Sequence, residues 1–193
     1  MCQPMPEKKL TTRKKSAPNL RGQLLEAGMR LVATGIPASR LDAKNVAADA
    51  KLKPAQFTAA FPQHEDFLLG LLRLLSEEVR TEAVKAIAMR PPGPSLIREG
   101  ITAYLDIVLH RPALLELTST LRAHPVCQQI TRDRMSSMVM VATLQLKMAH
   151  VKNAEGIGRL IMAMLFEITH VEYEARRPLP DYRQTIDAYF VGG

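Results

Sequence analysis

Three lysines and a glutamine lie close together between residues 44 and 56, and their side chains could contact DNA. Lys53 and Gln56 are the best candidates for base edges, because lysine can donate to guanine and glutamine can pair bidentately with adenine. Lys44, Lys51 and Thr58 are better suited to contacts with backbone phosphates. Lysines on short helices are solvated surface in most proteins, so DNA contact depends on the elements that position these residues.

Residue patterns typical of enzymes are weak in this sequence. Glu167 and His170 would share one face of a helix, but a carboxylate-bridged metal pair needs a second such motif and the sequence has none. Gly156 and Gly158 lack the preceding strand and the third glycine of a dinucleotide-binding loop. The sequence contains neither a Gly-x-Ser-x-Gly nor an HExxH motif. We therefore expect no catalysis, no metal site and no cofactor.

Composition indicates a globular protein with a polyanionic partner. The 193 residues include 26 Lys and Arg against 19 Asp and Glu, a net charge of +7, and 47% are hydrophobic. No apolar run is long enough for a membrane span, and the basic N-terminus lacks the apolar core of a secretory signal. Cys2 and Cys127 are too few for a disulfide framework, which favours a reducing cytoplasm. We expect residues 1–19 to be a mobile basic arm, either a solubilising tail or a phosphate contact.

The chain is expected to be all-α, because apolar residues recur at spacings of three and four. A first helix is predicted over 20–34, followed by Gly35 as its C-terminal cap. Residues 42–61 divide into two short helices, the first capped by Asp42 and the second opened by Lys53 and Pro54. A longer helix followed by two short ones joined by a tight turn is the outline of a helix-turn-helix domain.

Residues 20–70 resemble the DNA-binding domain of the tetracycline-repressor (TetR) family of transcriptional regulators. The resemblance implies an all-helical homodimer with an N-terminal three-helix domain over 20–66 that binds double-stranded operator DNA. It also implies a C-terminal domain over 67–193 that dimerises and binds a small apolar effector. The residues that carry the resemblance are Leu24, Leu25, Glu26, Ala27, Gly35, Val46, Ala47, Ala50, Leu52, Phe57, Phe61, Glu65, Asp66, Phe67 and Leu68.

Four positions depart from the TetR pattern. The family usually has Ser or Thr where Asp42 stands, Gly where Lys51 stands, Tyr where Thr58 stands and Lys where His64 stands. The resemblance implies that three of these positions touch DNA phosphates, so Asp42 and a mostly neutral His64 should weaken binding. Lys51 would lie in a turn that needs a positive φ, at a cost of about 1 kcal/mol, although its charge could favour the DNA backbone.

Three of the five phenylalanines, Phe57, Phe61 and Phe67, fall within eleven residues. We expect them to form the core of the N-terminal domain rather than a platform for stacking bases.

The C-terminal part is predicted to be a series of helices separated by prolines. One long helix over 65–90 ends at the Pro-Pro-Gly-Pro run 91–94, after which Ser95 is expected to cap the next helix. The helices over 125–150 and 154–177 are apolar around more than one face, as expected where a helix packs between its own core and a partner subunit. The resemblance implies a four-helix dimer interface made from these two helices of each subunit. The alternative is that they are core helices of a monomer.

The sequence defines the effector site less well than it defines the DNA contacts. Six of the ten methionines lie between Met135 and Met164, which suits either an adaptable ligand pocket or an ordinary soft core. His110 and His124 adjoin helix ends and are more often caps or surface residues. The candidate effector contacts are Tyr104, His110, Arg122, Met138, Met162, Phe166 and His170, with Cys127 and Glu167 as further polar groups.

Two functions remain open at this stage. The first is a dimeric cytoplasmic regulator, a repressor that a small apolar ligand releases from DNA. The second is a degenerate member of the family that has lost specific DNA binding and acts through protein or small-molecule contacts.

Overall fold

The computed structural model describes residues 19–91 and 93–190, so the predicted arm over 1–19 lies almost wholly outside the described residues. Every regular element in these two ranges is helical, as predicted. The N-terminal elements are α1 (Leu20–Ala33), the 3-10 helix η1 (Ala38–Arg40), α2 (Ala43–Asp49) and α3 (Pro54–Ala60). The C-terminal elements are α4 (His64–Ile87), α5 (Pro94–Leu109), α6 (Pro112–Thr120), α7 (Pro125–Met148), α8 (Ala154–Ala175) and α9 (Pro180–Phe190).

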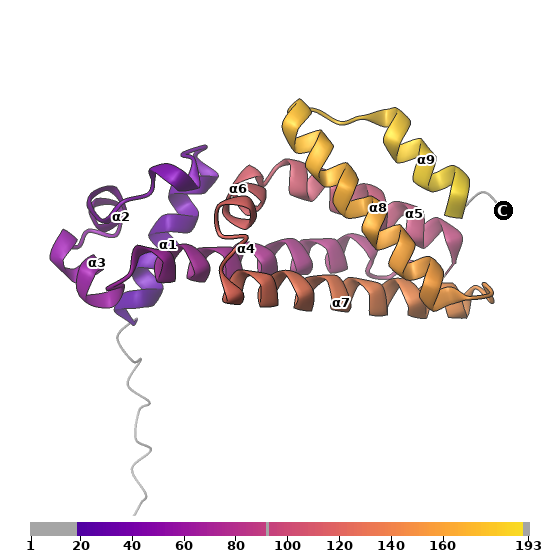
Figure 1. The fold of residues 1–193 in the computed structure, drawn as a ribbon, viewed down its shortest axis with the longest axis horizontal. Helices are drawn as coiled ribbons and strands as arrows, with labels where there is room; N and C mark the ends of the chain where they lie inside the picture. Colours follow the sequence, from indigo (N-terminus) through magenta and orange to yellow (C-terminus); the bar gives the residue numbers. More distant parts are fainter. Residues whose placement is uncertain (1–18, 92, 191–193) are drawn as a thin grey trace, which may run out of the picture.

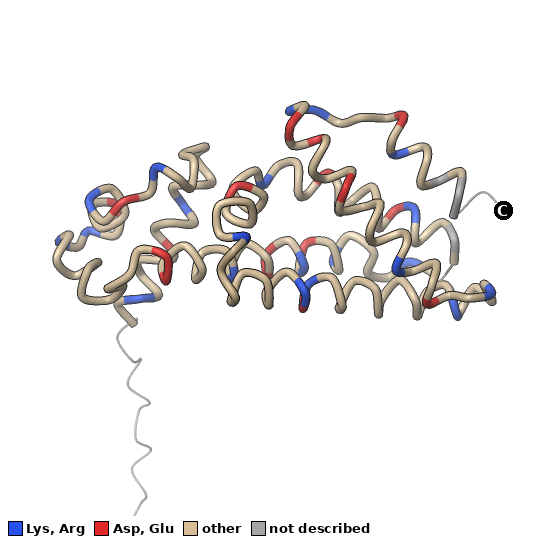
Figure 2. Tube along the Cα trace, in the orientation of Figure 1, with Lys and Arg blue, Asp and Glu red and all other residues tan. Residues whose placement is uncertain are grey.

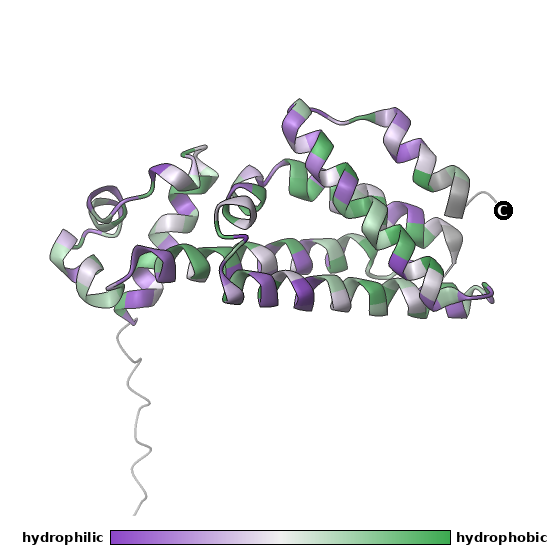
Figure 3. Ribbon diagram, viewed as in Figure 1, coloured by the Kyte–Doolittle hydropathy of each residue, from purple (hydrophilic) through white to green (hydrophobic). Residues whose placement is uncertain are grey.

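The molecule is elongated, with α1, α2 and α3 gathered at one end (Figure 1). Helix α4 starts at that end and runs into the C-terminal bundle, where it packs on α5, α6 and α7. Helices α7 and α8 form an antiparallel hairpin, and α9 lies against α8. Apolar residues recur along these helices (Figure 3). Because α4 belongs to both groups of helices, it links the two ends of the molecule.

Helix α1 ends as its sequence predicts. Thr34 is the C-cap, and Gly35 follows with a φ of 89°. The N–H groups of Gly35 and Ile36 donate to the carbonyls of Val32 and Leu31 at 3.0 and 3.2 Å. This pair of bonds is the Schellman motif, which satisfies carbonyls that a helix end would otherwise leave free.

Several predicted details of the C-terminal helices are wrong. Ser95 does not cap α5, because Pro94 already occupies the first turn and Gly93 is the N-cap. Helix α4 ends at Ile87 rather than Arg90, since Ala88 is extended and Met89 has a φ of 69°. The sequence pattern also did not predict η1, α6 or α9 as separate helices.

A network of charged side chains fastens α9 to the bundle. Glu172 of α8 is 1% exposed and accepts hydrogen bonds from Nε and Nη2 of Arg183 at 2.6 and 2.7 Å. Arg183 also donates through Nη1 to Asp106 of α5 at 2.6 Å. The buried carboxylate is therefore paired and hydrogen-bonded, as a buried charge must be to avoid a large desolvation cost.

None of the helices in the described ranges has the length and apolar character needed to cross a lipid bilayer.

Candidate nucleic-acid interface and ligand cavity

Helix α2 begins at a complete capping box. The Asp42 carboxylate accepts from the backbone N–H groups of Lys44 and Asn45 at 2.8 and 2.7 Å. The Asn45 side chain returns a bond by accepting from the Asp42 N–H at 3.0 Å. The predicted cap at Asp42 is thus confirmed, and two free N–H groups of the helix end are satisfied.

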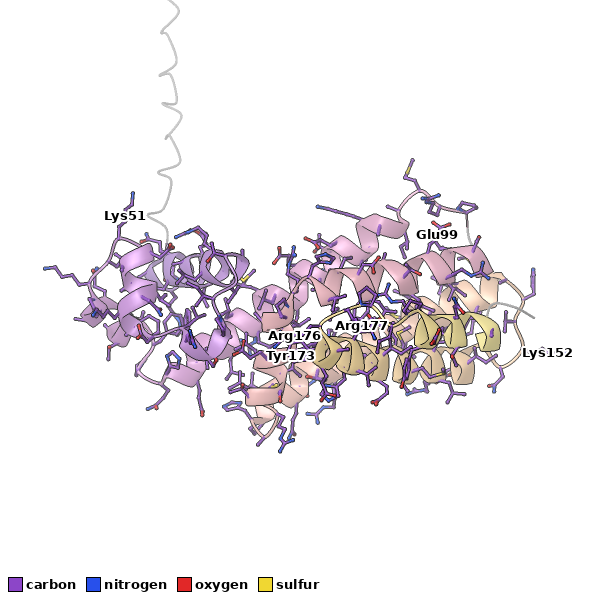
Figure 4. All side chains as sticks on the ribbon, turned by 90° about the horizontal axis from the view of Figure 1, so that it is seen from above. Lys51, Glu99, Lys152, Tyr173, Arg176 and Arg177 are labelled. Carbon is purple, nitrogen blue, oxygen red and sulfur yellow. The ribbon has the colours of Figure 1, made fainter. Side chains whose placement is uncertain are left out.

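Lys51 forms the turn between α2 and α3 and has a φ of 58°, the left-handed conformation expected there. Its N–H donates to the carbonyl of Ala48 at 3.1 Å, and the N–H of Leu52 donates to Ala47 at 2.8 Å. These two bonds make a second Schellman motif. Figure 4 shows the Lys51 side chain pointing away from the helices into solvent.

Lys53 and Gln56 are coupled at the start of α3. Lys53 is the exposed N-cap residue, and its N–H donates to Oε1 of Gln56 at 2.9 Å. The Gln56 amide oxygen therefore helps to cap its own helix, and the amide nitrogen, Nε2, remains as a donor for another partner. Bidentate pairing of Gln56 with adenine would require this cap to open.

The other three predicted DNA contacts lie on the same end of the molecule. Lys44 is exposed in the first turn of α2, and Thr58 is exposed on α3 with its hydroxyl 3.4 Å from the carbonyl of Pro54. His64 is the first residue of α4, and its ring lies 6.0 and 5.9 Å from the rings of Phe57 and Phe67. Figure 2 shows basic positions around α2 and the turn that follows it, with acidic positions interspersed.

The phenylalanine cluster is a core, as predicted. Phe57, Phe61 and Phe67 are 3%, 2% and 0% exposed. Their ring centroids lie 5.1 to 5.6 Å apart in tilted and edge-on contacts, and the guanidinium of Arg21 covers Phe61 at 4.5 Å. Such buried rings position α3 against α1 and α4 and cannot stack on bases.

An ion pair that the sequence analysis missed joins α1 to α2. Arg30 donates from Nε and Nη2 to one carboxylate oxygen of Asp49 at 3.0 and 2.8 Å. The pair is partly exposed, so its contribution to stability is small, but it offsets the negative charge of Asp49 near the basic end.

The C-terminal bundle contains a cavity of about 720 Å³, within the size range of small-molecule sites. Its walls come from α4, α5, α7 and α8, and most of them are aliphatic. Three of the predicted effector contacts, Tyr104, Met138 and Met162, line it. The other apolar wall residues are Val79, Ala83, Val84, Ile87, Leu96, Ile97, Ile101, Ile130, Met140, Val141, Ala142 and Leu165.

The remaining predicted effector contacts do not line this cavity. The Nδ1 atom of His110 lies 2.7 Å from the carbonyl of Asp106, so this histidine interacts with the end of α5. Arg122 lines a smaller hollow beside Cys127. Phe166 stacks under the guanidinium of Arg134 at 5.1 Å, and His170 pairs with Glu174 on the exposed side of α8 at 3.3 Å.

Apart from Tyr104, the polar residues that line the cavity were not predicted from the sequence. Ser76, Arg134 and Gln145 line it, and Oγ, Nε and Oε1 of these residues are buried without a hydrogen-bond partner in the described part of the chain. Ser76 stands in the apolar run of α4 around Leu72, Leu75 and Val79, which is the one sequence signal that could have identified it. Within the same ranges, no three His, Cys, Asp or Glu side chains are arranged to hold a metal ion.

Solved structures share this fold over most of the chain, whereas no family model and no curated protein matches the sequence. A transcriptional regulator from Rhodococcus sp. Rha1 aligns with a TM-score of 0.67 and 14% identity over 87% of this chain and 92% of its own. The multidrug binding protein EbrR, solved with imidazole, aligns with a TM-score of 0.68 and 17% identity over 89% and 95%. A protein from Shewanella sp. PV-4 described as a TetR family transcription regulator gives 0.59 and 14% over 90% and 97%.

The chain has the fold of the TetR-family transcriptional regulators. This confirms the predicted fold, an N-terminal helix-turn-helix followed by a C-terminal helical bundle. The three compared proteins are described as transcriptional regulators or as a multidrug binding protein.

Two departures from the TetR pattern are accommodated by local structure. Asp42 replaces a hydroxyl residue but serves the same capping role, and the N–H groups of Lys44 and Asn45 lie against its charge. Lys51 replaces glycine and adopts the left-handed conformation in spite of its side chain. The TetR-like helix-turn-helix is therefore intact in this chain as a folded unit.

Proposed function

We propose that this chain is a dimeric, cytoplasmic transcriptional regulator that binds operator DNA through α2 and α3 and is released by a small molecule in the α4–α8 cavity. One observation carries the proposal. Helix α4 begins with His64 and Phe67 against the helix-turn-helix, and three turns later its residues Ser76, Val79 and Ala83 line the cavity. A ligand that moves α4 would thereby move the DNA-binding helices. The proposal includes a boundary at about residue 66 between a DNA-binding domain and a domain for effector binding and dimerisation.

The proposed DNA contacts are Lys44, Lys51, Lys53, Gln56, Thr58 and His64. Lys53 and Gln56 would read base edges at the start of α3, the part of a recognition helix that enters the major groove. The exposed lysines on α2 and in the turn would contact phosphates. Effector binding would shift the population towards a conformation with a different separation of the two recognition helices. In that conformation the two helices would no longer match successive major grooves.

The dimer is proposed to form through α7 and α8. These helices leave large apolar side chains in solvent, with Leu144, Met148 and Leu160 at 55%, 42% and 58% exposed, while Ile161 and Leu165 of α8 are buried in the protomer. Apolar residues on both sides of one helix are expected where a symmetric partner covers the outer side.

The first experiment is selection of genomic fragments of the source organism by the purified protein at about physiological salt. Non-specific binding weakens steeply with salt, whereas specific binding persists. Enrichment of one palindromic site would support a dimeric sequence-specific regulator. Salt-sensitive, sequence-blind binding by the folded protein would instead favour the degenerate relative that acts through other contacts.

Three variants then test the assignment of base contacts on the selected site. Gln56→Glu keeps an oxygen for the Lys53 cap but removes the amide donor, and Lys53→Ala removes the ammonium group. Each should cost about 1–3 kcal/mol of specific binding and relax the preference at one base pair. Lys85→Ala removes an equal charge from the exposed side of α4 and should leave selectivity unchanged. Unaltered selectivity in both α3 variants would show that other residues read the bases.

A further inference from the structure

Three arginines line the cavity, and Arg134 is the least exposed of them. Arg134 belongs to α7 and is partly buried, and its guanidinium stacks on the ring of Phe166 at 5.1 Å. Its Nε atom is buried and has no hydrogen-bond partner in the described ranges. A buried guanidinium N–H without an acceptor is costly unless a ligand supplies one. The stacking on Phe166 fixes the plane of the guanidinium and hence the direction from which an acceptor would approach.

Tyr104 of α5 is a second polar residue that lines the cavity. It is 4% exposed, and burial raises the pKa of its phenol while the nearby positive charge of Arg134 acts in the opposite direction. The phenol is therefore a protonated donor close to the guanidinium. Two donors from different helices thus lie near one another in a mostly aliphatic cavity.

The acidic residues that line the cavity, Glu77 and Asp133, are exposed and have partners. Glu77 accepts from Arg80 at 2.7 to 3.2 Å, and Asp133 accepts from Gln129 at 2.6 Å. Their exposure and their partners reduce their attraction for a cation. The least exposed charged residue that lines the cavity, Arg134, is accordingly positive.

We propose that the cavity binds an amphipathic anion, with an apolar body along the aliphatic walls and a carboxylate on Arg134 and Tyr104. This inference rests on the proposed function for its assignment of the cavity as the effector site, and it refines the small apolar effector expected from the sequence. The unpaired Ser76 Oγ and Gln145 Oε1 supply further polar contacts around the head or along the body. Charge-assisted bonds from a planar guanidinium distinguish a carboxylate from a neutral head group of the same length.

The test compares three ligands that share one alkyl chain: dodecanoate, dodecanol and dodecyltrimethylammonium. Binding is measured by isothermal titration calorimetry below the concentration at which each forms micelles. Dodecanoate should bind about tenfold or more tightly than the other two. Equal affinities, tighter binding of the ammonium, or no binding of dodecanoate to the folded protein would each overturn the inference.

Variants of Arg134 locate the charge preference. Arg134→Gln should weaken dodecanoate about tenfold and change dodecanol by less than about twofold, whereas Arg134→Lys should retain part of the preference. Lys85→Gln removes an exposed positive charge from a residue of α4 that does not line the cavity and serves as the matched control, with both affinities unchanged. Circular dichroism of each variant shows whether it is folded, and Arg134→Lys keeps the test available if Arg134→Gln is not. A preference that survives in Arg134→Gln would contradict the assignment.

A parallel DNA-release assay separates this inference from the proposed function. If dodecanoate binds with the expected preference but does not release operator DNA, the ligand class stands and the release mechanism fails. If a neutral ligand releases DNA and dodecanoate does not bind, the regulator stands and the anionic ligand class is wrong.

Discussion

The carboxylate of Glu116 in α6 accepts a hydrogen bond from the backbone N–H of Ala38 in η1 at 2.8 Å. Its other oxygen accepts from the N–H of Ser39 at 2.9 Å. These are the first two N–H groups of the 3-10 helix, so the carboxylate caps an element of the N-terminal bundle from a helix that packs on α4 and α5. The two ends of the molecule are therefore joined by a charged contact as well as by the continuous α4.

We predict that Glu116→Gln weakens this contact and lowers the free energy of unfolding by about 1–2 kcal/mol. The amide keeps only one acceptor oxygen, so one of the two N–H groups loses its partner and the remaining bond loses its charge. Urea unfolding at about neutral pH measures the change. Glu26→Gln, at an exposed position on α1, is the control and should change stability by less than about 0.5 kcal/mol. An equal loss in both variants would contradict a specific role for Glu116.

The effect of Glu116→Gln should also depend on pH. Desolvation raises the pKa of Glu116, but the bonds from Ser39 and Ala38 and the charge of Arg176 outweigh it, so the pKa is lowered from its ordinary value of 4.5. A carboxyl group whose pKa is lowered by folding stabilises the folded state above its unfolded pKa, and this stabilisation is lost as pH falls through the folded pKa. The stability difference between wild type and variant should thus be constant above about pH 6 and shrink below 4.5. A difference that grows on acidification would refute this assignment.

The sequence predicted those helices whose ends are set by local residues. Gly35 and Asp42 mark the ends of α1 and α2 because a left-handed cap and a side-chain acceptor are local requirements. Helix α9 was missed because its residues are mostly polar and it is held by Arg183, whose partners Glu172 and Asp106 are distant in sequence. Such long-range pairs leave no periodic signal.

The two candidate sites differed in how much the sequence could predict. The proposed DNA contacts follow one another along two short helices, so placing the helices placed the residues. The cavity is built from four helices, and a residue such as Arg134 faces it only because of how α7 rotates against α4 and α5. Candidates chosen by chemical type, such as His110 and His170, instead lie at a helix end and on an exposed face.

Lys51 offers a test of the strained turn between α2 and α3. Because its φ is 58°, Lys51→Gly should raise the free energy of unfolding by about 1 kcal/mol relative to Lys51→Ala, which removes the same charge but keeps a Cβ. Thermal or urea unfolding of the two variants checks this. Both variants should also reduce the salt dependence of operator binding by about one phosphate contact. Equal stabilities of the glycine and alanine variants would show that the turn is not strained at Lys51.

Two glycines of α1 should respond in opposite ways to alanine. A Cβ at Gly28 would lie 2.7 Å from Cζ of Phe67, a ring that is fully buried between Phe57 and Phe61 and cannot move aside without displacing them. Gly28→Ala should therefore destabilise the protein by about 1–3 kcal/mol through overpacking. A Cβ at Gly22 meets no atom within 4 Å, so Gly22→Ala should stabilise α1 by about 0.5–1 kcal/mol through its helix propensity. Urea unfolding of both variants measures the contrast. The double variant Gly28→Ala with Phe67→Leu should lose less free energy of unfolding than the sum of the two single variants, because the smaller side chain relieves the clash. Stabilisation by both alanines would show that α1 does not pack on Phe67 as closely as described.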